Sequence, residues 1–272
     1  MQSDLGPKRL AKMLVPQPIR DVLRPCWNSI RFNRTLRFAS VVLLGPERRW
    51  GGAQGEEVQF WDHVLATRGA EWKDVYPMRY DPEWPLQDYL CSLVAAPPGA
   101  VVRILDVGAG PLTILGKKWA GRTVDITALD PNADAYDRLL NKHGVTPPIR
   151  TRLGYAELLT TVVPQSSFDL VHSRNAIDHS RDAVLAIEQM VGCAKPGSWV
   201  FLNHSIREAE KEAYSGSHQW NLYPRDGAFY VGRPGRFSVN MTRRLADRAK
   251  VEVRTSHDGP TWFVVVMKRY SD

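Results

Sequence analysis

Two glycines and two aspartates in the middle of the chain have the types and spacing of a nucleotide-binding turn. The segment VVRILDV has the composition of a buried strand that contains Asp106, and Gly108 and Gly110 follow it directly. Glycine lets the backbone approach a ligand closely because it carries no Cβ. Asp130 ends a second apolar run about 20 residues further on, where a carboxylate suits two ribose hydroxyls. The pattern therefore favours a nucleoside as ligand.

The turn lacks the third glycine of a dinucleotide site. That motif places a further glycine two or three residues later, close to the pyrophosphate. Pro111, Leu112 and Thr113 stand there instead. A diphosphate would fit this loop poorly, which counts against a nicotinamide oxidoreductase. We expect a helix over residues 112–119 whose free N–H groups point into the loop.

A second group of reactive residues follows the predicted fourth strand. Asp178 and His179 are adjacent in the segment SRNAIDHS. They are a candidate acid–base pair, because histidine titrates near neutral pH. The alternative is structural: Asp178 or Ser180 would cap the helix that is predicted to begin near Arg181.

Three more polar residues follow the predicted fifth strand. His204 ends that strand, Glu208 comes four residues later, and His218 lies in the loop GSHQWNLYP. Together with Asp178 they could bind a divalent metal such as Mg²⁺, which would orient a diol and lower its pKa. Their spacing matches no established zinc pattern. A metal-free base (His179, His204 or His218) and purely structural histidines are the alternatives.

The elements that must position these residues alternate between strand and helix. The pattern predicts strands near residues 101–107, 124–129, 149–153, 168–173 and 198–203, and helices near residues 112–119, 132–142, 155–162 and 181–194. Such alternation with short connections predicts a parallel sheet with right-handed crossovers. Two β-rich runs, 250–254 and 262–267, flank a turn and predict a terminal hairpin.

Five motifs in this order resemble those of the class I S-adenosylmethionine-dependent methyltransferases. They are LDVGAGPLT, ALDP, YAELL, FDLVHSRNAIDH and AKPGSWVFLNH, and they cover roughly residues 100–270. The resemblance implies an α/β, Rossmann-like fold with a mostly parallel seven-stranded sheet, a terminal antiparallel hairpin and a helical N-terminal extension. It divides the chain into an extension over residues 1–98 and a methyltransferase domain over residues 99–272.

The same resemblance implies S-adenosylmethionine as the cofactor and assigns residues to its parts. The loop 106–110 would hold the methionine part, Asp130 the ribose, and Ala156 with Glu157 the adenine. Asn175 would line the methyl-transfer site. Arg79 is a candidate partner for the cofactor's carboxylate, since a guanidinium can donate two parallel hydrogen bonds, and a surface ion pair is the alternative. The expected cofactor-binding set is Asp106, Gly108, Ala109, Gly110, Asp130, Pro131, Ala156, Glu157, Asn175 and Arg79.

A wider pattern resembles a bacterial methyltransferase subgroup associated with polysaccharide and glycoside assembly. It comprises FWDHVL, RYDP, LDVGAGPLT, NAIDHS, REAE and HQWN. It implies O-methylation of a sugar or another hydroxylated small molecule, with a small molecule or a glycan as acceptor. N- or C-methylation of a natural product is the alternative within enzymes, and a cofactor-binding scaffold or partner subunit is the alternative outside them. RNA methylation is disfavoured, because NAID stands where an N-P-P-Y tetrad would follow strand four.

The positive charge of the chain is concentrated near its N-terminus. The 272-residue chain has a formal net charge of +7, and residues 1–50 carry ten Lys and Arg against three acidic residues. Apolar residues are interleaved with these charges, which is compatible with peripheral contact with an anionic membrane or a lipid-linked glycan. A solvated basic face is the alternative. Nucleic acid is disfavoured as a partner because the segment lacks an aromatic stacking platform.

The cysteines and the first residues favour a cytoplasmic protein. Cys26, Cys91 and Cys193 are far apart and match no metal or redox spacing. The N-terminus lacks the apolar core of a secretory signal. The glycine-rich stretch 45–55 is predicted to be a loop, and it marks a candidate boundary or hinge.

Overall fold

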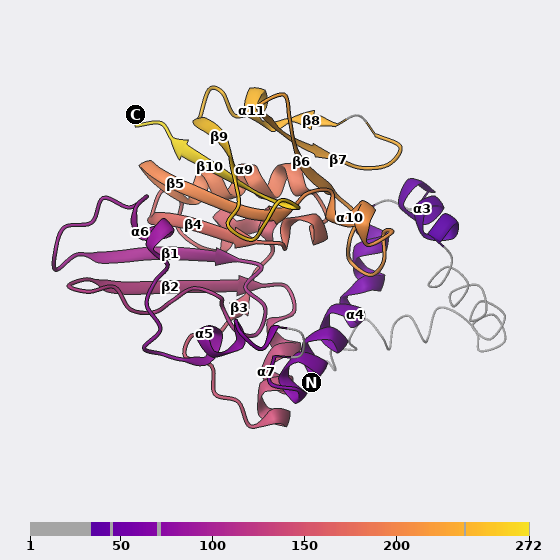
Figure 1. Cartoon of the computed structure of the whole chain (residues 1–272). Coiled ribbons are helices and arrows are strands. Elements are labelled where there is room, and N and C mark those ends of the chain that lie inside the picture. The colour runs from indigo at the N-terminus through magenta and orange to yellow at the C-terminus, as the bar shows by residue number, and fades with distance from the viewer. Residues whose placement is uncertain (1–33, 44–45, 70–71, 237, 272) are drawn as a thin grey trace, which may run out of the picture.

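A seven-stranded sheet forms the centre of the protein (Figure 1). The structure is a computed structural model, and it describes residues 34–43, 46–69, 72–236 and 238–271. The strands are β1 (Val101–Val107), β2 (Thr123–Asp130), β3 (Arg152–Leu153), β4 (Phe168–Arg174), β5 (Ala194–Ser205), β9 (Ala249–Thr255) and β10 (Trp262–Arg269). Their order across the sheet is β3-β2-β1-β4-β5-β10-β9.

The strand directions confirm the predicted architecture. Strands β1 to β5 pair in parallel, whereas β10 is antiparallel to both of its neighbours, β5 and β9. The inner strands are buried on both faces, as a sheet covered by helices requires. Because β1, β2, β4 and β5 run in the same direction, their carboxyl ends share one edge. The predicted site residues that follow these strands therefore meet at that edge.

Three of the predicted helical regions are confirmed. They are α7 (Ala133–His143), the 3₁₀ turn η2 (Ala156–Leu158) continued by α8 (Leu159–Val162), and α9 (Ala183–Cys193). The carboxylate of Asp182 accepts hydrogen bonds from the backbone N–H groups of Val184 and Leu185, both at 3.0 Å. Asp182 therefore caps α9. This cap leaves Asp178 and Ser180 available for other contacts.

The predicted helix over residues 112–119 is wrong, because that segment is irregular. Residues 109–117 are all buried, so no polar face exists for an amphipathic helix. Thr113 Oγ accepts a hydrogen bond from the N–H of Leu115. The carbonyl oxygens of Leu112 and Ile114 accept hydrogen bonds from the side chains of Arg79 and Gln87. Backbone groups that a helix would pair with one another thus pair instead with side chains, one of them within the segment and two outside it.

The predicted loop over residues 45–55 is also wrong where the structure describes it. Residues 46–55 belong to α4 (Pro46–Ala66), which follows α3 (Arg34–Leu43). Three glycines weaken this part of the helix by about 1 kcal/mol each. External contacts offset that cost: Trp50 packs against the ring of Tyr155 at 5.8 Å, and Gln54 accepts a 2.9 Å hydrogen bond from Asn132. Tertiary packing, not local propensity, forms this helix.

An insertion between β5 and β9 forms a second, smaller sheet. It contains α10 (Glu208–Lys211), β6 (Asn221–Arg225), β7 (Ala228–Gly232), β8 (Val239–Asn240) and α11 (Met241–Arg244). The three strands are antiparallel. Asp226 and Gly227 join β6 to β7 with φ of +50° and +73°, the signs that a type I′ hairpin turn needs. Two short helices, α5 (Tyr76–Tyr80) and α6 (Asp88–Cys91), precede the main sheet.

Most of the basic segment 1–50 lies outside the described residues. Its contact with a membrane surface or a glycan stays a prediction, and so does the domain boundary near residue 98. Among the described helices, none has both the length and the apolar composition that crossing a bilayer requires.

Candidate functional site

The glycine loop after β1 is packed against protein side chains. Gly108 and Gly110 have left-handed backbone angles, with φ of +71° and +65°. A Cβ on Gly108 would collide with Ala176, and a Cβ on Gly110 would lie 2.6 Å from the ring of Trp61. The loop after β4 and helix α4 therefore occupy the space that side chains at Gly108 and Gly110 would fill. These contacts fix the shape of the turn.

Asp106 is buried at the carboxyl end of β1 and has a partner for each oxygen. Its Oδ1 lies 2.7 Å from His172 Nδ1, and its Oδ2 accepts a 2.5 Å hydrogen bond from Thr113. His172 is itself buried and stacks on Phe201. Sequence reasoning missed His172, although β4 places it directly opposite Asp106 in the parallel register. A polar residue inside an apolar strand was the available signal.

Asp130 ends β2 beside the glycine loop. Its Oδ2 accepts a hydrogen bond from the N–H of Gly110 at 3.1 Å, and its Oδ1 accepts one from the N–H of Asn132 at 2.9 Å. Burial raises the pKa of Asp130 to about 7, and the nearby carboxylate of Glu57 adds to this rise. A carboxylate has about four acceptor positions, so Asp130 keeps acceptor capacity for a ligand.

Ala156 and Glu157 lie where the chain leaves β3, and Glu157 has a structural partner. Its Oε1 accepts hydrogen bonds from the backbone N–H groups of Arg181 and Asp182, at 2.5 Å and 3.1 Å. The Arg181 guanidinium lies over the rings of both Trp50 and Tyr155, 5.0 Å and 4.7 Å from their centroids. This end of the site is therefore walled by aromatic and planar groups.

Arg79 belongs to α5 and contacts the segment that follows the glycine loop. It donates a 2.5 Å hydrogen bond to the carbonyl oxygen of Leu112, and its guanidinium lies over the rings of Trp61 and Trp72. Burial lowers the pKa of Arg79 to about 10, so the side chain is charged at neutral pH. Its Nε has no hydrogen-bond partner among the described residues.

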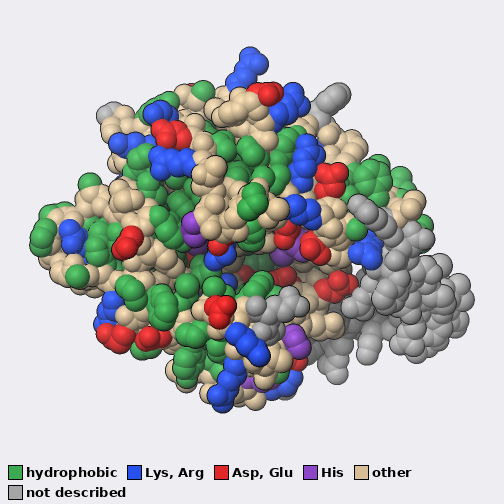
Figure 2. Space-filling model, in the orientation of Figure 1, with side chains coloured by type: hydrophobic (Ala, Val, Ile, Leu, Met, Phe, Trp, Pro, Cys, Tyr) green, Lys and Arg blue, Asp and Glu red, His purple; other side chains and the backbone are tan. Residues whose placement is uncertain are grey.

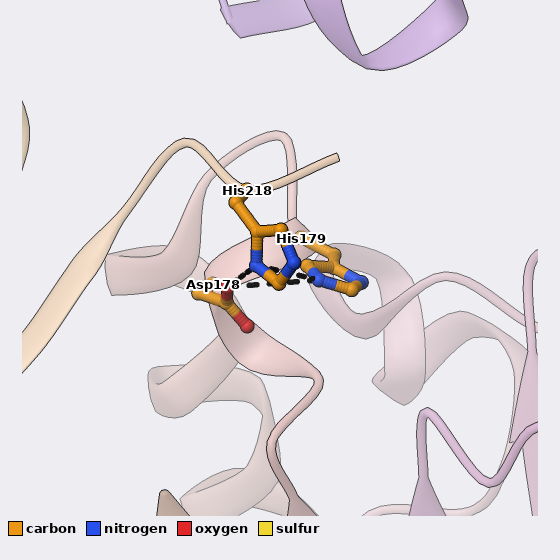
Figure 3. Close-up of side chains that lie close together, drawn as sticks. All are labelled: Asp178, His179 and His218. Atoms are coloured by element: carbon orange, nitrogen blue, oxygen red, sulfur yellow. Dashed lines mark hydrogen bonds and ion pairs between the residues drawn. The ribbon is translucent and has the colours of Figure 1, made fainter. Parts of the chain in front are cut away.

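Asp178 is the centre of a cluster with three histidines. Its Oδ2 lies 2.6 Å from His218 Nδ1 and 3.6 Å from His179 Nε2, and the two histidine nitrogens are 3.1 Å apart. Its Oδ1 lies 3.1 Å from His204 Nε2. Figure 3 shows Asp178, His179 and His218 turned toward one another. Glu57 approaches from α4, with its Oε2 3.6 Å from His179 Nδ1.

Asp178 and the histidines of this cluster stabilise one another's charged forms. Burial alone would raise the pKa of Asp178, but the charges of His179 and His218 and hydrogen bonds from His204 and His218 hold it well below its usual range. Burial alone would lower the pKa of His218, but Asp178 outweighs burial and raises it above its usual value. Asp178 is therefore a carboxylate that binds and orients imidazole rings.

His204 and Glu208 are placed differently from His218. Both ring nitrogens of His204 face acceptors, since Nδ1 lies 2.8 Å from the carbonyl oxygen of Ser205 and Nε2 faces Asp178. Glu208 accepts a 3.2 Å hydrogen bond from the amide of Asn175, whose own oxygen accepts from the N–H of Ser205. Of the four residues predicted to bind metal, the structure brings together Asp178, His204 and His218 but places Glu208 with Asn175.

One cavity of about 680 Å³ joins the glycine loop to the histidine cluster, and Figure 2 shows the face of the molecule that is hollowed there. The predicted residues that line it are Arg79, Asp106, Gly108, Ala109, Gly110, Asp130, Pro131, Ala156, Glu157, Asn175, His179, Glu208 and His218. Asp178 and His204 are buried behind this wall.

Helix α4 supplies cavity residues that sequence reasoning missed. Trp50, Gln54, Glu57 and Trp61 all line the cavity. Glu57 and Trp61 are four residues apart, and Glu57 accepts a 3.0 Å hydrogen bond from the indole of Trp61. A carboxylate on the same helical face as a buried tryptophan was the available signal.

Comparison with known proteins agrees with this geometry. Residues 105–202 match the methyltransferase domain family. Uncharacterized methyltransferases of Mycobacterium bovis and Mycobacterium tuberculosis are 30% identical over 108 residues, which is 38% of this chain and 53% of theirs. The chain thus spans about half the length of these curated relatives.

The fold is shared with a solved structure at low sequence identity. An O-methyltransferase family protein from Burkholderia thailandensis superposes with a TM-score of 0.50 and 12% identity, covering 93% of this chain and 70% of that one. A methyltransferase from Aquifex aeolicus gives a TM-score of 0.40 and 17% identity, covering 70% of this chain and 90% of that one. Residues 105–202 are therefore similar to a methyltransferase domain, and the sheet that contains them has the class I methyltransferase fold.

Proposed function

We propose that the protein is an S-adenosylmethionine-dependent methyltransferase that methylates a hydroxyl of a sugar or another polyhydroxylated small molecule. The observation that carries this proposal is the continuous cavity that runs from Asp130 and the glycine loop to His218. Its volume of about 680 Å³ falls in the range of small-molecule sites. A donor and an acceptor can therefore meet inside one cavity.

The residues around Asp130 fit S-adenosylmethionine. The buried Asp130 carboxylate has acceptor positions beyond its two backbone donors, which suits the two ribose hydroxyls. Arg79 lines the cavity with an Nε that lacks a partner among the described residues, which suits the methionine carboxylate. When bound, S-adenosylmethionine supplies an electrophilic methyl group: the acceptor oxygen bonds to its carbon while the carbon–sulfur bond breaks and leaves its electron pair on sulfur.

The cluster at the other end of the cavity can take the proton that a hydroxyl acceptor must lose. Asp178 binds Nδ1 of His218 at 2.6 Å, which fixes the ring and its tautomer and leaves Nε2 to accept a proton. In the ion-free protein we assign the role of general base to His218. Its raised pKa makes it a stronger base than an ordinary histidine.

The cavity wall near His218 favours a neutral, hydroxyl-rich acceptor. Glu57, Glu208 and Glu212 all line the cavity. Carboxylates accept hydrogen bonds from hydroxyls and repel phosphate groups. A neutral amine attacks before it loses a proton, whereas a hydroxyl needs a base, so the Asp178–His218 pair favours O-methylation over N-methylation.

Transfer of a labelled methyl group to a panel of acceptors tests the proposal. The panel pairs neutral glycosides and polyols with amines of the same size. We expect label on hydroxylated acceptors, and we expect His218→Gln to lower kcat by about 10²–10⁴-fold because general base catalysis is lost. His63→Ala removes an exposed histidine from α4 and serves as the matched control. Label on amines alone, or full activity in His218→Gln, would overturn the assignment.

A further inference from the structure

Three ligand atoms converge on one point at the wall of the cavity. They are Asp178 Oδ2, His179 Nε2 and His218 Nδ1, whose separations are 2.6, 3.1 and 3.6 Å. Asp178 and His179 belong to the 3₁₀ turn η3 (Ile177–His179) after β4, whereas His218 belongs to the insertion after β5. Figure 3 shows that the three side chains meet although they come from separate segments.

The spacing of these atoms suits a small divalent ion. Bonds from zinc to nitrogen or oxygen ligands are about 2.0–2.2 Å, so neighbouring ligands of a tetrahedral ion lie about 3.3–3.6 Å apart. Two of the three separations, 3.1 Å and 3.6 Å, are within a few tenths of an ångström of that range. The third, 2.6 Å, is a hydrogen bond between His218 and Asp178. An ion would replace the proton of this bond and widen it.

Neighbouring groups already hold each ligand in place. His204 binds the other oxygen of Asp178 at 3.1 Å, and Glu57 lies 3.6 Å from the other ring nitrogen of His179. The backbone N–H groups of Gln219 and Trp220, which follow His218, donate to the carbonyl oxygen of Asp178 at 3.2 Å. Such outer contacts orient ligands in metal sites and fix the tautomer of a ligating histidine.

We propose that Asp178, His179 and His218 bind one divalent transition-metal ion, Zn²⁺ or an ion of similar ligand preference. Two imidazoles and a carboxylate suit zinc, iron, cobalt or nickel better than Mg²⁺, which prefers oxygen ligands. His179 and His218 line the cavity, so the remaining coordination positions open into it. Three protein ligands with an open position are the arrangement of catalytic metal sites.

This metal site adds a step to the proposed function. It rests on that function in one respect: the ligand in the open coordination position is taken to be the acceptor hydroxyl. An acceptor hydroxyl in the open position would be oriented by the ion and would have a lower pKa. When the ion binds Nδ1, His218 loses its Nδ1 proton to solvent and takes up a proton on Nε2, so the ring stays neutral. The ion then takes over the activation of the hydroxyl that His218 performs in the ion-free protein.

Cobalt titration of the full chain tests the site without any activity assay. The protein is stripped with a chelator and titrated with Co²⁺, whose visible absorption reports its coordination number. We expect one Co²⁺ per chain, bands of a four- or five-coordinate ion, and loss of the bands when Zn²⁺ is added. His179→Ala and His218→Ala should each weaken binding by more than about 100-fold. His63→Ala should bind Co²⁺ like the wild type.

S-Adenosylhomocysteine binding is measured on the same samples to separate the two proposals. Retained S-adenosylhomocysteine binding in His179→Ala and His218→Ala shows that these variants are folded. The metal site is overturned if the wild type shows no saturable Co²⁺ binding, or if both histidine variants bind Co²⁺ like the wild type. Metal binding without S-adenosylhomocysteine binding would instead overturn the proposed function and leave the metal site standing.

Discussion

Folding shifts the pKa of Asp130, and ligand binding should shift it again. Burial raises its pKa to about 7, from 3.8 for an exposed aspartate. The folded protein therefore keeps a proton that the unfolded chain releases between about pH 4 and 7. This group costs stability as the pH rises through that window, because the folded state must then bury the charge.

Cofactor binding should consequently be linked to proton release. Ribose hydroxyls that donate to Asp130 favour its ionised form, so they lower its pKa. We expect the affinity for S-adenosylhomocysteine to rise between pH 5.5 and 7.5, with net proton release at pH 6.5. Calorimetry in two buffers of different ionisation enthalpy measures the released protons. Proton release that persists unchanged in Asp130→Asn would show that another group is responsible.

The candidate residues could be predicted from their types, but their partners could not. Motif order placed Asp106, Asp130 and Asp178 at the carboxyl edge of the sheet, because parallel strands share that edge. No local signal distinguishes His218, which lines the cavity, from His204, which is buried behind it. That difference depends on how the insertion packs against the turn that carries Asp178, which is a long-range contact.

At the scale of elements, α4 and the glycine loop are fitted to each other. A Cβ on Gly110 would lie 2.6 Å from Trp61, so Gly110→Ala should push α4 away from the loop. Gly121→Ala is the matched control, since Gly121 has a similar φ of +70° and nothing within 4 Å of its Cβ position. The control measures backbone strain alone, about 1–2 kcal/mol. Gly110→Ala should add about 1–3 kcal/mol of overpacking.

Urea unfolding and S-adenosylhomocysteine titration measure this difference. Gly110→Ala should lose more stability than Gly121→Ala and should also lose cofactor affinity. Equal loss of stability in the two variants, with unchanged affinity for S-adenosylhomocysteine, would show that α4 does not form part of the cofactor site.

A second contact ties α4 to the loop that carries His218. Nη2 of Arg49 donates to the carbonyl oxygens of Tyr214, Gly216 and His218. Arg49→Lys removes this planar group, so we expect kcat for methyl transfer to fall by about 10–100-fold through misplacement of His218. S-Adenosylhomocysteine affinity should not change. Arg48→Lys, at an exposed neighbouring position, is the control. A fall in cofactor affinity with kcat unchanged would contradict this role for Arg49.

The two element predictions that were wrong share one physical cause. Residues 112–119 have helical composition, but residues 112–117 are all buried. Arg79 and Gln87 satisfy two of the carbonyl groups in this segment. Residues 46–55 have loop composition, but contacts of Trp50 and Gln54 make them helical. In both segments tertiary contacts override local propensity. Sequence periodicity carries no information about such contacts.

At the scale of the whole molecule, the carboxylates and imidazoles that line the cavity come from three parts of the chain. The sheet edge supplies Asp130, α4 supplies Glu57, and the insertion supplies His218. The parallel pairing of β1 to β5 and the terminal antiparallel hairpin were predicted, because alternating elements and motif order constrain them. The three-stranded sheet of the insertion was not predicted, although Asp226-Gly227 between two apolar runs was an available hairpin signal. The shape of the cavity follows from how these three parts pack with one another and with the segment that carries Arg79.

Calorimetric titration of the full chain with S-adenosylhomocysteine, repeated with Asp130→Asn, tests the central claim most directly. The account predicts one saturable site in the wild type and binding weakened by about 10–100-fold in Asp130→Asn, because a charge-assisted hydrogen bond contributes about 1.5–3 kcal/mol. Thermal unfolding of the variant shows that it is folded. Absence of binding to the wild type, or equal affinity in both proteins, would contradict the assignment of this cavity to the cofactor.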